Sequence, residues 1–122
     1  FRKICLLTFA LIMNTLPSLA QSGLVFDRPT WDFGTIRETD GPVTHRFVCR
    51  NEGEHPEVIL QVTTTCGCTT PRYTRKPILP GEETEITVTY DPANRPGNFS
   101  RELAVFTADR RIAAKLRITG SV

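Results

Sequence analysis

Residues 86–90 read ITVTY, with the apolar side chains of Ile86, Val88 and Tyr90 alternating with two threonines. Successive side chains of a β-strand point to opposite faces, so the alternation predicts a strand with one buried and one exposed face. Pro80 and Gly81 precede this run and fit the two central positions of a type II turn, whose second residue has a positive φ. The stretch therefore predicts a half-buried strand entered through a tight turn.

Similar short runs extend along the chain from residue 21 onward. They are separated by clusters of Gly, Pro, Asn and Asp, and no sustained helical period occurs among them. Strand regions are expected at 24–26 with 31–36, 43–50, 58–65, 72–76, 86–90, 103–107 and 112–122. About seven strands in roughly 100 residues predict an all-β fold, a single immunoglobulin-like β-sandwich.

Local features predict where these strands bend or end. Gly34 interrupts its run, which predicts a bulge or a close-packed point. Apolar residues are nearly continuous from 58 to 62, so a bulge or a strand buried on both faces is expected there. Residues 109–111 predict the tight turn of a hairpin, and the polar residues 72–76 predict an edge segment.

Residues 1–20 have the three regions of an export signal. Arg2 and Lys3 precede a largely apolar stretch at 4–16, and Ser18, Leu19 and Ala20 supply the small residues that a signal peptidase needs. We therefore expect a helical signal peptide over 1–20, cleaved after Ala20, and one domain over 21–122. The apolar stretch is shorter than the ~20 residues of a membrane-spanning helix, so a retained membrane anchor is the weaker alternative and no stable membrane span is expected after cleavage. The domain is expected in the periplasm, on the cell surface or in the medium.

Charge gives no support to a nucleic-acid or anionic-membrane partner. Arg2 and Lys3 are the only charged residues of the first twenty, which leaves 13 basic and 13 acidic residues in 21–122. A basic stripe on an outer face is one possibility, and a solvated face of ordinary charges is the simpler one. The residues concerned are Arg46, Arg50, Lys115 and Arg117.

Three cysteines remain in residues 21–122, and an odd number leaves at least one unpaired within a monomer. Cys49 lies on the inward face of its expected strand, whereas Cys66 lies at the far end of the next one. At ~3.3 Å per residue the two levels differ by ~20 Å, beyond the ~7 Å limit between the Cα atoms of a disulfide. Cys49 is therefore expected to be the unpaired cysteine.

Cys66 and Cys68, separated only by Gly67, are the concentrated chemistry of the sequence. Four interpretations remain open. The pair could form a strained disulfide that is easily reduced, or two thiols packed at a strand end. It could also bind a soft metal, Cu(I) or Zn(II), or carry out thiol exchange or intermolecular attachment. His45, on a buried face, and His55, in a loop, are expected to be structural and solvated, respectively.

A set of residues along the chain matches the pattern of a known family: Phe33, Gly34, Ile36, Phe47, Asn51, Gly53, Cys66, Gly67, Cys68, Thr69, Ile78, Pro80, Gly81, Val88, Tyr90, Pro96, Gly97, Phe99, Leu116, Ile118 and Gly120. Over roughly residues 26–122 the chain resembles the bacterial family called domain of unknown function 1573. The Cys-Gly-Cys-Thr block and the Pro-Gly turn are its specific part. The resemblance implies an exported immunoglobulin-like sandwich, related in shape to ASH modules and major sperm protein, without an assigned biochemical activity. Cys49 departs from the pattern, since a large apolar residue is expected there.

No Ser-His-Asp arrangement, phosphate loop or carboxylate pair has usable spacing, so neither enzyme activity nor a resident cofactor is expected. The leading hypothesis is an exported, non-catalytic binding or structural module of the bacterial cell envelope. Its partner would be another protein or an envelope component, with residues 72–76 accepting a partner strand. The alternative is a thiol-redox or soft-metal protein, binding copper or zinc, centred on Cys66 and Cys68.

Overall fold

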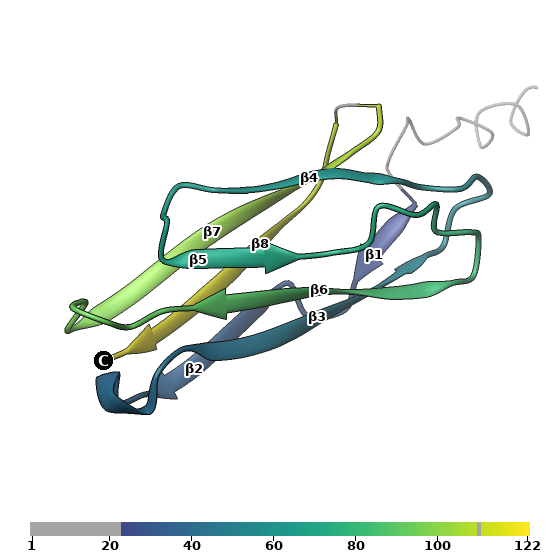
Figure 1. Ribbon diagram of the computed structural model, residues 1–122. Coiled ribbons are helices and arrows are strands. Elements are labelled where there is room, and N and C mark those ends of the chain that lie inside the picture. The colour runs from purple at the N-terminus through teal and green to yellow at the C-terminus, as the bar shows by residue number, and fades with distance from the viewer. Residues whose placement is uncertain (1–22, 110) are drawn as a thin grey trace, which may run out of the picture.

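Eight strands form two four-stranded sheets in the computed structural model, which describes residues 23–109 and 111–122 (Figure 1). The strands are β1 (Leu24–Phe26), β2 (Thr30–Thr35), β3 (Val43–Asn51), β4 (Ile59–Thr64), β5 (Thr69–Arg72), β6 (Glu83–Tyr90), β7 (Asn98–Thr107) and β8 (Ile112–Ser121). A 3-10 helix, η1 (Glu38–Asp40), precedes β3. The predicted immunoglobulin-like β-sandwich is confirmed, with one strand more than expected. The predicted signal peptide at 1–20 lies outside the described residues.

The two sheets have the strand orders β1-β3-β6-β5, here sheet A, and β2-β8-β7-β4, here sheet B. Neighbouring strands are antiparallel except for β2 and β8, which are parallel. The chain leaves sheet A after β1 and enters sheet B at β2, with Pro29 between them. There the N–H of Arg117 donates to the carbonyl of Pro29 at 2.9 Å.

The core lies where the inward faces of the two sheets meet. Ile86, Val88 and Tyr90 are fully buried, as their alternation predicts, and they face the buried apolar side chains of sheet B, including Leu103, Val105, Leu116 and Ile118. The Tyr90 ring stacks on Phe99 across the sandwich, with the ring centroids 4.0 Å apart. A Cβ atom at Gly120 would lie 2.5 Å from the Phe99 ring, so this position of β8 requires glycine.

Several local predictions are confirmed, and one is wrong. Gly34 has a φ of 70° within a register shift between β2 and β8, as expected for a bulge. A second register shift follows Ile59. Gly81 has a φ of 86°, and the N–H of Glu82 donates to Leu79 as in a type II turn. The edge segment predicted at 72–76 is wrong, because the strand runs over Thr69–Arg72 and ends where the prediction begins.

A fully buried asparagine ties one end of the sandwich together. The Asn51 side-chain Nδ2 donates to the carbonyls of His55 and Ile78, both at 2.8 Å, and its Oδ1 accepts from the N–H of Gly53. The Asn51 backbone exchanges further hydrogen bonds with Gly81 and Glu82, before β6. One amide therefore joins the end of β3, the following loop and the entry to β6.

We expect Asn51→Ala to lower the free energy of unfolding by about 2–4 kcal/mol, because a buried carbonyl and a part-buried one lose their donor and one N–H loses its acceptor. Urea denaturation followed by circular dichroism measures the change. Asn98→Ala, on the exposed part of β7, is the matched control and should cost less than about 0.5 kcal/mol. Equal effects of the two substitutions would contradict the role of the buried amide.

Candidate functional site

The Cys66-Gly67-Cys68 segment lies where the chain passes from β4 in sheet B to β5 in sheet A. The structure joins the two cysteines by a disulfide, with their Cα atoms 5.2 Å apart. The N–H of Cys68 lies 3.2 Å from Cys66 Sγ, and the N–H of Thr69 donates to the Cys66 carbonyl. Cys68 is buried and Cys66 is half-buried. The pair therefore closes a tight corner between the two sheets.

The sulfur chemistry of the described residues is constrained by this arrangement. Disulfide sulfurs offer no thiolate for metal binding or nucleophilic attack. Among residues 23–109 and 111–122, no three His, Cys, Asp or Glu side chains are grouped so as to hold a metal ion. Cys49 is the free cysteine of these residues, and burial raises the pKa of its thiol to about 11. A hydrogen bond with the Thr84 backbone acts in the opposite direction, but the Cys49 thiol stays protonated at neutral pH.

Strand β5 lies at one edge of sheet A, and its outer side is poor in hydrogen-bond donors. The N–H of Asp91, which directly follows β6, donates to the carbonyl of Cys68. Backbone groups alternate in direction along a strand, so Cys68 and every second residue after it direct their N–H and C=O groups toward β6. Thr69 and Pro71 then face outward. Pro71 has no N–H, and the N–H of Thr69 is already bonded to Cys66. A partner strand needs donors as well as acceptors, so this edge is a poor site for strand addition.

Strand β4 lies at the edge of sheet B, and its outer side carries both kinds of backbone group. Gly97 and Val122 exchange two backbone hydrogen bonds, so Gly97 and every second residue after it along β7 direct their N–H and C=O groups toward β8. The residues between them, including Ala104, direct these groups toward β4. Thr63, opposite Ala104, bonds to β7. The N–H and C=O groups of Val62 and Thr64 consequently face away from β7.

An apolar surface lies beside this edge on the outer face of sheet B. Leu60, Gln61, Thr63 and Phe106 line a hollow of about 420 Å³, and Leu60 is 42% exposed. Ile112 pairs with Phe106 and is 52% exposed. Both strands flanking Phe106 have register shifts here, and such bulges re-aim side chains. We call Leu60, Phe106 and Ile112 the Leu60 surface, the part of the site that the sequence did not reveal.

Charged side chains on the outer faces pair with glutamates. Arg46 and Arg50 lie on sheet A, whereas Lys115 and Arg117 lie on sheet B, so they cannot form one basic stripe. Arg46 lies 3.7 Å from the carboxylate of Glu85, and Arg50 lies 2.8 Å from that of Glu83. On sheet B, Lys115 and Arg117 lie 4.0 and 2.8 Å from the carboxylate of Glu102. The solvated face of ordinary charges is the interpretation that the structure supports.

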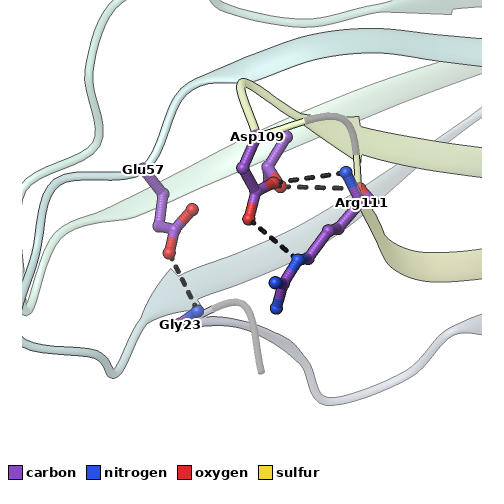
Figure 2. Close-up of polar contacts among 5 residues, drawn as sticks. Gly23, Glu57, Asp109 and Arg111 are labelled. Carbon is purple, nitrogen blue, oxygen red and sulfur yellow. Dashed lines mark hydrogen bonds and ion pairs between the residues drawn. The ribbon is translucent and has the colours of Figure 1, made fainter. Parts of the chain in front are cut away.

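Two carboxylates near the β7–β8 hairpin have structural partners (Figure 2). Asp109 Oδ1 accepts from the Thr107 hydroxyl and from the N–H of Arg111, and Oδ2 lies 3.7 Å from Arg111 Nε. The hydrogen bond from Thr107 is the main reason that the pKa of Asp109 is lowered. Glu57 Oε1 accepts from the N–H of Gly23 at 3.1 Å. Asp109 holds the hairpin, as expected for a turn residue, and Glu57 holds the start of β1.

His45 is a half-buried histidine in an aromatic stack. Its ring lies parallel to Trp31, with centroids 4.1 Å apart, and meets Phe47 edge-on at 4.7 Å. Burial lowers the pKa of His45, so the imidazole is neutral at pH 7. The histidine serves packing, as expected from its position on the inward face.

Three solved structures place the fold among known proteins. A protein of unknown function from Porphyromonas gingivalis W83 has a TM-score of 0.71 at 18% identity, covering 88% of this chain and 50% of that one. The ASH / PapD-like domain of human CEP192 has a TM-score of 0.69 at 7% identity, covering 88% and 90%. The Vibrio cholerae VesB protease has a TM-score of 0.67 at 17% identity, covering 82% and 32%. This chain thus spans half of the first protein and about a third of the protease, and at these identities the likeness shows the fold alone.

Sequence comparison gives one further result. The model of the family described as "Protein of unknown function (DUF1573)" matches residues 24–122. No curated protein matches the chain.

Alkylation counts the accessible thiols of the chain from residue 21 onward. We expect none in the native protein, one after denaturation and three after denaturation with reductant. Native protein should react at no cysteine at neutral pH, because Cys49 is buried and protonated and the other two sulfurs are bonded. Denaturation without reductant should expose Cys49 alone, and denaturation with reductant all three. Mass spectrometry after iodoacetamide treatment gives the count, with Cys49→Ala as the control. Modified Cys66 in unreduced protein would contradict the disulfide.

A titration of His45 followed by NMR should have its midpoint below 6.5, since burial disfavours the imidazolium. The unfolded chain binds this proton more readily, so the stability linked to neutral His45 is present above about pH 6.5 and lost as the pH falls through the folded-state pKa. His45→Phe should remove that part of the pH dependence of unfolding. A midpoint above 6.5 would contradict the effect of burial.

Proposed function

Since the chain belongs to the DUF1573 family of proteins of unknown function, we propose that it is an exported, non-catalytic protein-interaction module of the bacterial cell envelope. The observation that carries the proposal is the Leu60 surface beside the open edge of β4. An exposed apolar surface next to unpaired backbone groups is the combination that strand addition uses. Backbone hydrogen bonds would supply affinity, and the hollow would select a side chain.

Export is supported by two separate features. The first twenty residues carry the sequence features of a signal peptide. A disulfide such as that between Cys66 and Cys68 is typical of an oxidising compartment, because cytosolic thiols are kept reduced. Between residues 23 and 122, leaving out residue 110, no helix is long and apolar enough to cross a bilayer. We place the domain in the periplasm, at the cell surface or in the medium.

A non-catalytic role is supported by the state of the reactive groups. Cys49 is buried with a raised pKa, Cys66 and Cys68 are bonded to each other, and His45 is held between aromatic rings. None of these groups is poised as a nucleophile or general base. The alternative thiol-redox or copper and zinc function requires prior reduction of Cys66 and Cys68. The thiol count described above decides whether that reduction has occurred.

The partner is expected to be a protein that contributes an extended segment to β4. Its backbone would bond to Val62 and Thr64, and an apolar side chain would enter the hollow between Leu60 and Phe106. Strand β5 is a weaker choice, since Pro71 removes a donor from its outer edge. The β4 edge therefore replaces residues 72–76 as the proposed docking site.

We expect Leu60→Asp to reduce partner binding at least about tenfold, because it places a charge in the apolar hollow. The measurement is quantitative affinity purification from an envelope extract of the source bacterium, followed by mass spectrometry. Leu79→Asp is the matched control, since Leu79 is 51% exposed in the turn before β6, away from β4. Thermal melting verifies that both variants fold. Equal retention by the two variants, or turnover in a hydrolase or oxidoreductase screen, would contradict the proposal.

A further inference from the structure

Strand β3 has an open edge that is separate from the Leu60 surface. Its pairing with β1 ends at Phe26 opposite Cys49, whereas β3 itself extends back to Val43. Figure 1 shows β1 beside only one end of β3. After Phe26 the chain crosses to sheet B and pairs with β8 instead. Among residues 23–109 and 111–122, no strand pairs with the N-terminal half of β3 on that side, so this half lies at the edge of sheet A.

The alternation of β3 determines which backbone groups occupy this edge. The N–H of Asn51 donates toward β6, to Glu82 O, whereas the N–H of Glu52 donates toward β1, to Gly23 O. Alternate residues of an antiparallel strand direct their backbone groups to opposite edges. Thr44 and Arg46 consequently present both N–H and C=O groups to the side that β1 has left. This edge has the donors that the outer edge of β5 lacks.

A hollow of about 200 Å³ opens between the sheets at the same place. We call it the side slot. Trp31 from β2 and His45 and Phe47 from β3 form its aromatic lining, and their rings are held against one another at 4.1 and 4.7 Å. The side slot is smaller than the ~300–1,000 Å³ of a small-molecule site. Its size and apolar walls suit one large side chain of a peptide.

Charges at the rim of the side slot favour an acidic partner. Asp27, Arg28 and Arg46 lie there, so positive charge is in excess. Arg46 has only a long, exposed contact with Glu85 at 3.7 Å, and Arg28 forms no ion pair with any residue that the structure describes. Two copies joined through this edge would bring their Arg28 and Arg46 side chains together, and like charges across strands are destabilising. A second copy is therefore the poorer occupant.

We propose that the open edge of β3 binds a short extended segment of an acidic partner polypeptide. The segment, about three to four residues long, adds antiparallel to β3 along the line that β1 begins. One apolar side chain enters the side slot, and the next residue places a carboxylate on the outer face beside Arg46. This site goes beyond the proposed function at β4, because it lies on the opposite edge of the sandwich and uses different residues.

The test measures fluorescence polarisation of a labelled peptide, in which glutamate alternates with leucine, on binding to the chain from residue 21 onward. We expect at least about tenfold weaker binding to Arg46→Glu, and also to Thr44→Pro, which removes an N–H from the open edge. A peptide with lysine in place of glutamate should bind the wild type poorly and Arg46→Glu better. Lys115→Glu, on the outer face of sheet B, is the matched control and should leave binding unchanged.

Three outcomes would overturn the proposal. One is a peptide affinity that neither Arg46→Glu nor Thr44→Pro alters, with folding verified by circular dichroism. Another is the loss of peptide binding in Leu60→Asp alone, which would assign the peptide to the β4 edge instead. The third is self-association in analytical ultracentrifugation that Thr44→Pro abolishes, since the occupant would then be a second copy. Failure of partner binding at the Leu60 surface leaves this result unaffected, so the two proposals fail separately.

Discussion

Backbone hydrogen bonding at the strand edges is the constraint on which the rest of this structure depends. Each open sheet ends in strands whose outer N–H and C=O groups lack a partner, and a sandwich must satisfy, protect or use them. In this structure the edge strands β5, β4 and β3 differ in the backbone groups that they leave unpaired. Pro71 and the Cys66 carbonyl remove the donors of β5, whereas β4 keeps its outer groups beside an apolar surface. The early exit of β1 leaves half of β3 open above a slot lined with aromatic rings.

The fold could be predicted from the sequence because burial on one face of a strand leaves a period of two. Ile86, Val88 and Tyr90 show that period and are fully buried. The positive φ of Gly81 is equally local, since Pro-Gly has few alternatives in a turn. The assignment of strands to sheets is not local. Residues 24–36 give no indication that their two halves belong to different sheets. Alternation of apolar residues shows which face of a strand is buried, but it does not show which strand or sheet lies next to it.

The candidate site was predicted less well, for a related reason. Cys66 and Cys68 attract attention in the sequence, but in the structure they close a corner and expose little chemistry. Leu60 is one of several apolar residues in a continuous run, and the run does not indicate which of its members is exposed; in the structure it is Leu60, beside a register shift. Whether a sheet edge can accept a further strand depends on which residues direct their backbone groups outward. The pairing of β5 with β6 makes Pro71 one of these residues, so its missing N–H weakens that edge. Register is a property of strand pairs and cannot be read from one strand.

The parallel pairing of β2 with β8 also determines how the domain responds to tension. β2 is the first strand of sheet B along the chain and β8 is the last, so pulling residues 30 and 121 apart would slide these two strands past each other. Their connections, from Pro29 with Arg117 to Ile36 with Ser121, would then share the load instead of breaking one at a time. β1 precedes β2 on the same chain and is held to β3 over three residue pairs, so it would detach before β2 is loaded. The fold is therefore expected to resist stretching along its own chain.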